Sequence, residues 1–129
     1  MTRQLAIVIA TSALLVGLGS SGCGKARPKA DADLARETLR MALDAWKKGQ
    51  PADSLKDRSP PINVADHEWR GGFALLDYRV AEKDQHFGSD LRCQVELSLR
   101  NPKGKTLTKK ATYSVGTNNA LIVVREDDE

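Results

Sequence analysis

One stretch near the end of the chain constrains the fold most, because it specifies two paired strands and the turn between them. Residues 91–100 alternate between apolar and polar side chains, the pattern of a strand with one buried and one solvent-exposed face. Residues 101–104 read Asn-Pro-Lys-Gly and predict a type I turn with a G1 bulge. The pairing that follows sets Leu91 against Val115, Cys93 against Tyr113, Val95 against Ala111, Leu97 against Lys109 and Leu99 against Leu107.

The apolar pattern and the turn predict the same register for this hairpin. A slip by one residue would set the apolar row of residues 91–99 against threonines, a lysine and a serine. Lys109 is the one polar residue in the facing row, and we expect its side chain to extend toward an open edge of the sheet.

An amphipathic helix precedes the strands. Apolar side chains recur at helical spacing from Ala35 to Trp46, with charged side chains on the opposite face. We expect Asp33 to cap the start of this helix and Gly49 to end it.

Three more strands are expected from the alternation of side chains and from the turn residues that bound each segment. They cover residues 62–69, 73–82 and 120–125, and residues 83–90 are expected to form a loop. Either Ile122 and Val124 or Leu121 and Val123 can face the core in the last strand, so its facing stays open.

The order of these elements predicts an α+β fold. One N-terminal amphipathic helix packs on a four- to five-stranded antiparallel sheet. This order, over residues 33–125, resembles a cystatin-like roll, in which a sheet curls around one helix. Many unrelated functions occur on that fold, so the resemblance implies no activity.

The N-terminal residues predict export. A basic start at Arg3, an apolar run over residues 5–18 and a small-residue segment form a secretory signal peptide. The small residues end at Gly22, directly before Cys23, and this arrangement resembles the signal of bacterial lipoproteins. The mature part resembles small uncharacterised bacterial lipoproteins.

The lipoprotein resemblance implies that residues 1–22 are removed and that Cys23 carries a diacylglycerol with palmitate-type chains. It also implies passage across the cytoplasmic membrane and anchoring to a cell-envelope membrane, on its periplasmic or outer face. Ordinary signal cleavage without a lipid and an uncleaved membrane anchor are the alternatives.

This organisation leaves one small domain. Residues 1–22 are the signal peptide, 23–32 a lipid-anchored tether, 33–125 the α+β domain and 126–129 an acidic tail. Removing residues 1–22 from the 129 leaves 107 residues, enough for a single domain. The mature chain is nearly balanced in charge, because only Arg3 of the 20 basic residues lies in the signal, against 17 acidic residues. We therefore expect no nucleic-acid partner.

The residues with catalytic or metal-binding chemistry do not converge. Asp66 and Glu68 share one face of an extended strand while His67 points away, so we expect a solvated strand end without a metal ion or cofactor. Cys93 lies in the apolar row and is expected to be a small buried side chain, not a nucleophile paired with His67 or His86. No enzymatic activity is expected.

Two surfaces remain as candidates for binding. The wet face of the sheet could meet an anionic polymer through polar side chains: Arg92, Glu96, Arg100, Thr108, Lys110 and Thr112. Alternatively, the open end of the roll could form a ligand pocket near Trp69, Tyr78 and Tyr113. Trp46 belongs to the helix stripe and is expected in the core.

These observations predict a membrane-anchored lipoprotein of the cell envelope with a small non-enzymatic binding or scaffolding domain. A ligand-binding module is the alternative. The expected partners are membrane lipid, through acylated Cys23, and an envelope protein or polymer. The oligomeric state stays open.

Overall fold

The computed structural model describes residues 28–126, so the predicted signal peptide, Cys23 and residues 127–129 lie outside the described part. No helix within residues 28–126 is long and apolar enough to cross a membrane. The described elements are α1 (Ala32–Lys47), the 3₁₀ helix η1 (Ala52–Asp57), β1 (Ile62–Ala65), α2 (His67–Arg70), β2 (Ala74–Phe87), β3 (Asp90–Arg100), β4 (Thr106–Gly116) and β5 (Leu121–Glu126).

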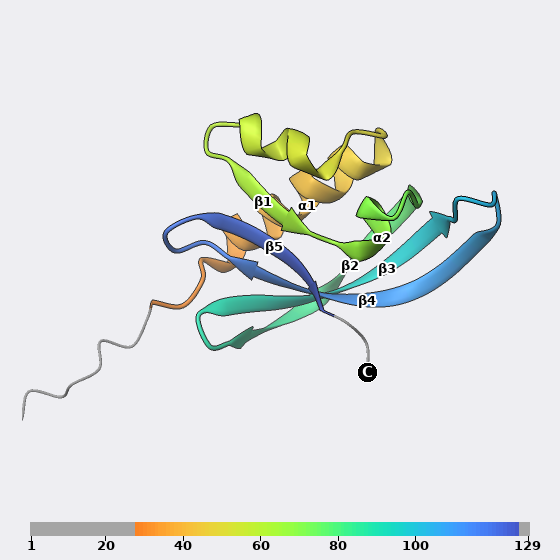
Figure 1. The fold of residues 1–129 in the computed structure, drawn as a ribbon. Helices are drawn as coiled ribbons and strands as arrows, with labels where there is room; N and C mark the ends of the chain where they lie inside the picture. The colour runs from red at the N-terminus through yellow and green to blue at the C-terminus, as the bar shows by residue number, and fades with distance from the viewer. Residues whose placement is uncertain (1–27, 127–129) are drawn as a thin grey trace, which may run out of the picture.

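The fold is α+β, with the helices on one side of a mixed five-stranded sheet (Figure 1). The strand order is β1-β5-β4-β3-β2, and four of the strands pair antiparallel with their sequence neighbours. β1 instead pairs parallel with β5. The expectation of a wholly antiparallel sheet is wrong at this strand. The pairing joins residues about sixty positions apart, which local side-chain alternation does not specify.

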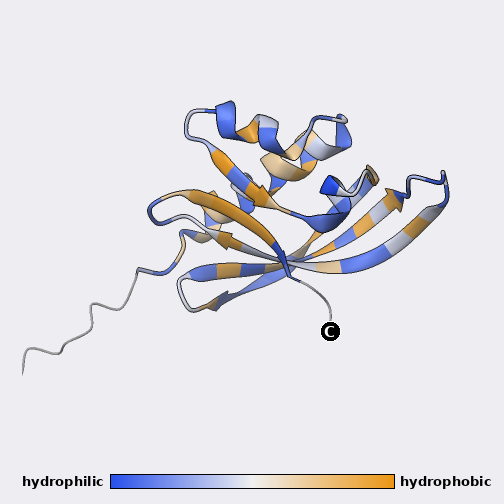
Figure 2. Cartoon of the chain, in the orientation of Figure 1, coloured by the Kyte–Doolittle hydropathy of each residue, from blue (hydrophilic) through white to orange (hydrophobic). Residues whose placement is uncertain are grey.

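The central hairpin has the predicted register. β3 and β4 pair Leu91 with Val115 at one end and Leu99 with Leu107 at the other. In the turn, the amide of Asn101 donates to the carbonyl of Lys105 at 2.8 Å, and Gly104 has a φ of 86°. That φ lies in the left-handed region, which glycine adopts without a steric penalty. Figure 2 shows the alternation of hydrophobic and hydrophilic residues along both strands.

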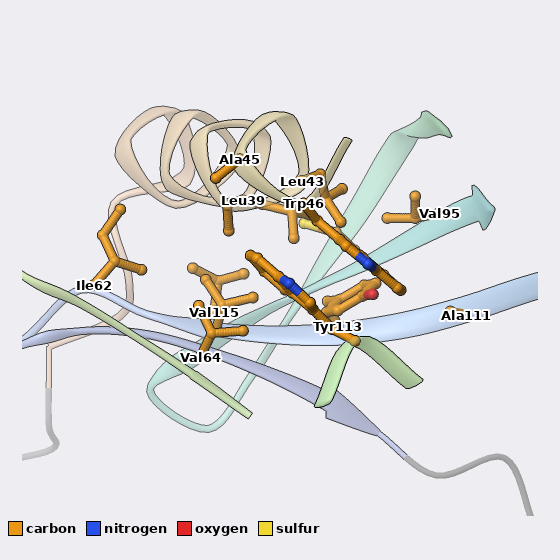
Figure 3. Packing of buried hydrophobic residues seen from close by; sticks show 14 of the residues in the cluster. Leu39, Leu43, Ala45, Trp46, Ile62, Val64, Val95, Ala111, Tyr113 and Val115 are labelled. Carbon is orange, nitrogen blue, oxygen red and sulfur yellow. The ribbon is translucent and has the colours of Figure 1, made fainter. Parts of the chain in front are cut away.

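α1 covers the inner face of the sheet. Figure 3 shows Leu39, Leu43 and Trp46 projecting from this helix toward Tyr113 and Val115 of β4. Leu39 is completely buried, and only 2% of Trp46 is exposed. The apolar stripe of α1 and the inner row of β4 therefore form the centre of the core.

α1 begins two residues earlier than expected. Asp31 caps it, accepting a hydrogen bond from the amide of Leu34 at 3.0 Å, while Asp33 lies in the first turn. Both residues have capping chemistry, so composition alone does not choose between them. The other end is as predicted, with Gly49 at a φ of 79°.

The segment expected as one strand over residues 62–69 divides at Asp66. β1 ends at Ala65, and the Asp66 carboxylate accepts from the amides of Glu68 and Trp69 at 3.0 and 3.1 Å. These bonds satisfy helical amides that have no partner inside the helix, so the chain turns into α2. The expected strand is correct only for its first half.

β2 is longer than expected, because residues 83–87 continue the strand where a loop was predicted. The chain turns only at Gly88 and Ser89. β2 is an edge strand, and its register against β3 shifts between Val80 and Asp84. Backbone pairing extends an edge strand without requiring apolar alternation, so this part carries no clear sequence signal.

β5 turns Leu121 and Val123 toward the core and leaves Ile122 and Val124 exposed. This settles the facing that the sequence left open. Glu126, expected at the start of an acidic tail, is the last residue of β5 and pairs with Thr112 of β4.

We predict that Leu39→Ala destabilises the domain by about 2–5 kcal/mol, because it removes a fully buried side chain from the α1–sheet contact. Leu34→Ala is the matched control in the same helix, since Leu34 is 37% exposed, and it should cost less than about 1 kcal/mol. Urea unfolding followed by circular dichroism measures both changes. Equal losses would contradict the packing of α1.

Candidate functional site

Two tryptophans close one end of the core. Trp46 of α1 stacks on Trp69 of α2, with ring centroids 5.3 Å apart and ring planes inclined by 7°. The Trp46 indole N–H donates to the carbonyl of Phe73 at 2.8 Å, and the Trp69 indole N–H donates to the carbonyl of Gln50 at 2.9 Å. Both rings are buried, so the pair joins α2 and the neighbouring loops to α1 and offers no exposed stacking platform.

A shallow hollow of about 330 Å³ lies beside this pair, mostly along apolar side chains. Trp69, a predicted pocket residue, lies in its wall, while Tyr78 and Tyr113 are not among its lining residues. The Tyr78 hydroxyl donates to Asp44 of α1 at 2.6 Å. Burial, with a contribution from Asp44, raises the pKa of Tyr78 to about 12. Tyr113 is buried in the core and bonds to Asp66.

A cluster of charged side chains and one tyrosine, all buried except the partly exposed Lys109, lies where α2 meets β4 and β5. We call it the Arg125 cluster, and its members are Asp66, Glu68, Lys109, Tyr113 and Arg125. Arg125 lies 2.6 Å from Glu68 and 3.6 Å from Asp66, with only 2% of its side chain exposed. Lys109 approaches Glu68 at 3.1 Å, and the Tyr113 hydroxyl donates to Asp66 at 2.5 Å.

The cluster corrects one expectation. Asp66 and Glu68 do not form a solvated strand end, because α2 turns both carboxylates into the protein, where 2% and 6% of these residues are exposed. Lys109 lies beyond the part of β4 that pairs with β5, and its side chain, 34% exposed, forms an ion pair with Glu68 that the sequence did not predict. His67, the first residue of α2, is exposed and lies outside the cluster.

Sequence reasoning missed the role of Arg125, although a signal was present. Lys109 interrupts an otherwise apolar row, and Arg125 follows Leu121 and Val123 at the alternate spacing of a strand. Two basic residues on an inward face require buried acidic partners. The nearby Asp66 and Glu68, next to an apolar segment, supply them.

The electrostatics of the cluster favour its charged form. Burial by itself would raise the pKa of Glu68, but hydrogen bonds and charge from Arg125 and Lys109 outweigh it and hold that pKa below its usual value. Burial and the neighbouring Asp66 raise the pKa of Tyr113, so its hydroxyl keeps the proton that it donates. Two carboxylates face two cations, and the cluster stabilises the position of α2.

Cys93 and His86 also lie outside the Arg125 cluster. Cys93 is fully buried, and burial raises the pKa of its thiol, which disfavours the reactive thiolate. His86 lies in the outer part of β2, where it pairs with Leu91. Within residues 28–126, no three His, Cys, Asp or Glu side chains are grouped to hold a metal ion.

The outer face of the sheet carries two adjoining hollows, of about 430 and 330 Å³, which share Gln94. They border the register shift of β2 between Val80 and Asp84. An irregularity of this kind bends an edge strand locally and increases its twist, which opens space against the neighbouring strand. We call the two hollows together the outer groove.

The outer groove is lined by basic and acidic side chains and, in the larger hollow, also by Val80, Ala81 and Val95. Of the six residues expected on the wet face, Glu96 and Lys110 line the larger hollow and Arg92 and Thr112 the smaller one. Arg100 and Thr108 line neither hollow.

Ion pairs order one end of the groove. Arg92 contacts Glu126 at 2.8 Å, and the Ser114 hydroxyl donates to the same carboxylate at 2.5 Å. The bonds from Arg92 and Ser114 lower the pKa of Glu126, so this carboxylate stays charged. Near the other end, Arg79 approaches Glu96 at 3.5 Å and is 80% exposed. The groove therefore offers both positively charged hydrogen-bond donors and negatively charged acceptors to a polar partner.

No protein-family model, curated protein or solved structure matches this chain. The function is accordingly argued from the geometry above and from the sequence.

We predict that Arg125→Met destabilises the domain by about 3–5 kcal/mol, because it leaves buried carboxylates without their charge partner. Arg79→Met is the control, because Arg79 is exposed and its ion pair is long, and it should change stability by less than about 0.5 kcal/mol. Urea unfolding at pH 7 measures both.

The pH dependence of the unfolding free energy provides a second test of the role of Arg125. Because the folded-state pKa of Glu68 is lowered, its stabilising contribution is present above the unfolded pKa of about 4.3 and is lost as the pH falls through the folded value. Without Arg125, Glu68 keeps only Lys109 as a charge partner, so protonation of Glu68 costs the variant less stability than it costs the wild type. The gap between wild type and Arg125→Met should therefore narrow from pH 7 to pH 3, and a gap that is constant or widens would contradict the assignment.

Proposed function

We propose that this chain is a membrane-anchored lipoprotein of the cell envelope whose small domain binds or scaffolds another envelope component without catalysing a reaction. The observation that carries the proposal is the placement of Cys23, directly after small residues and only five residues before Pro28, the first described residue of the fold. A diacylglycerol on Cys23 would hold the domain at a bilayer, since two or more acyl chains anchor a protein stably.

The side chains that could act in catalysis are already bonded or buried, which supports binding over catalysis. Asp66, Glu68 and Tyr113 are engaged in the contacts that position α2. Cys93 is buried within the apolar row of β3. A catalytic site requires such groups to meet in an accessible cleft, with bonding capacity left for a substrate.

The outer groove is the surface that we assign to the partner. Its lining combines basic, acidic and amide side chains with three small apolar ones in the larger hollow, and this mixture favours an envelope protein or polymer with polar groups of both signs. A polymer of uniform negative charge would meet Glu96 and Glu126 as well as Arg92 and Lys110. We therefore favour a protein partner.

The finer fold assignment is part of this proposal. A single long helix packed on the inner face of a mostly antiparallel sheet supports a cystatin-like roll. The alternative function, a ligand module with a pocket near Trp69, Tyr78 and Tyr113, has less support. The hydroxyl groups of the two tyrosines are bonded to Asp44 and Asp66, and only Trp69 borders the hollow beside the tryptophan pair.

We predict that Cys23→Ser abolishes incorporation of labelled palmitate into the protein, because the sulfur that carries the diacylglycerol is gone. Cys93→Ala is the matched control, since it removes the other cysteine of the chain, which is buried in the domain, and it should keep the label. Gel autoradiography and the mass of the N-terminal peptide measure the result. Label that persists in Cys23→Ser would refute the anchor.

We also predict that a photoreactive amino acid replacing Gln94, at the centre of the outer groove, forms a discrete covalent adduct in intact cells. The same amino acid replacing Glu37, on the exposed side of α1, should form none. Immunoblotting after irradiation and mass spectrometry of the adduct identify the partner. Identical patterns at the two positions, or no adduct at Gln94, would count against a binding role for the groove.

A further inference from the structure

The point at which the chain enters the domain is fixed by side-chain contacts. The carbonyl of Pro28 accepts a hydrogen bond from the side-chain amide of Asn118 at 2.7 Å. The amide of Asp31 donates to the hydroxyl of Thr117 at 3.1 Å. Both partners lie in the turn between β4 and β5. The first described residues are therefore held against this turn.

A second turn lies at the same end of the domain. Pro28 shares a hollow of about 360 Å³ with Ser89 and Asp90 from the β2–β3 hairpin and with Asn118 and Ile122. Figure 1 shows the β2–β3 turn and the β4–β5 turn on either side of the incoming chain. We call this part the tether end, formed by Pro28, residues 87–90 and residues 117–120.

The distance from Cys23 to the tether end is short. Cys23 lies five positions before Pro28, and a fully extended chain spans at most about 18 Å over these five steps. A domain of this size is roughly 30 Å across. If Cys23 is acylated, the tether end therefore lies within reach of the membrane surface, whereas the β3–β4 turn with Lys103 and Lys105 lies at the other end of the hairpin.

The chemistry of the tether end fits a lipid surface. Phe87, the last residue of β2, is 58% exposed, the largest exposed fraction among the large apolar side chains of the described residues. Its ring lies under the guanidinium of Arg92, 4.0 Å from the ring centroid. The two turns beside it carry glycine, serine, threonine and asparagine, and Asp90 is the acidic residue of this group.

We propose that the tether end lies against the lipid bilayer and that Phe87 enters the headgroup region. An exposed aromatic side chain at the end of a hairpin loses apolar surface to the boundary between headgroups and acyl chains, where aromatic residues are favoured. Asp90 is the one charged side chain in residues 87–90 and 117–120, so few charged groups in the two turns undergo desolvation there. The inference rests on the proposed acylation of Cys23, which keeps the bilayer within reach of Phe87.

The test uses the full-length acylated protein reconstituted in vesicles of phosphatidylethanolamine and phosphatidylglycerol, with a nitroxide quencher on a fraction of the headgroups. A fluorophore is attached through Ser89→Cys at the tether end or through Lys103→Cys at the opposite turn. Both variants also carry Cys93→Ala, so that the introduced thiol is the reactive one. We expect quenching at Ser89→Cys to be several-fold stronger than at Lys103→Cys.

Phe87→Ser, combined with Ser89→Cys, tests the role of the aromatic ring. The lipid on Cys23 is retained in this variant, so we expect quenching to weaken while the protein stays bound to the vesicles. Equal quenching at Ser89→Cys and Lys103→Cys would overturn the orientation, and no effect of Phe87→Ser would overturn the insertion of the ring.

The mass of the N-terminal peptide from the same samples tests the acylation of Cys23 separately from the membrane contact of the tether end. An acylated peptide together with a solvent-exposed Ser89→Cys label overturns the membrane-facing surface and leaves the anchor in place. An unacylated peptide refutes the anchor itself, and the inference falls with it.

Discussion

Arg125 lies among side chains from three elements, and the position of α2 depends on its contact with Glu68 and Asp66. Burying a carboxylate without a partner costs several kcal/mol. The inward position of Glu68 in α2 therefore requires a positively charged side chain on the sheet to pair with it. β5 supplies that cation at the end of a row that is otherwise apolar. With Lys109, the cluster holds two positive and two negative side chains, which reduces the cost of removing them from water.

The consequences of this contact extend to the rest of the core. Because α2 is held, Trp69 stacks on Trp46 and closes the end of the core between α1 and the sheet. The same strand that carries Arg125 also pairs with β1 in parallel, so one short strand joins the helical layer, the sheet edge and the charged cluster. The inner face is thereby filled, and the two surfaces that we assign to binding, the outer groove and the tether end, lie outside the core.

Those two accessible regions face different environments in the function that we propose. The tether end combines Phe87 with turns in which Asp90 is the one charged side chain, and it lies few residues after Cys23 in the chain. The outer groove around Gln94 extends along the sheet from Arg92 toward Glu96. An anchored domain of this kind would present the groove beside the membrane, where a second envelope component can approach it from the side.

Local patterns in the chain were enough to predict α1 and the β3–β4 hairpin, because side-chain periodicity and the Asn101–Gly104 turn depend on residues close together in the sequence. The same patterns also marked Cys93 as a core residue. The parallel partner of β1, the break at Asp66 and the partners of Lys109 came from the folded arrangement. Each of these features depends on groups distant along the chain, and a buried charge or an unpaired strand edge is satisfied by whichever group the fold brings near it.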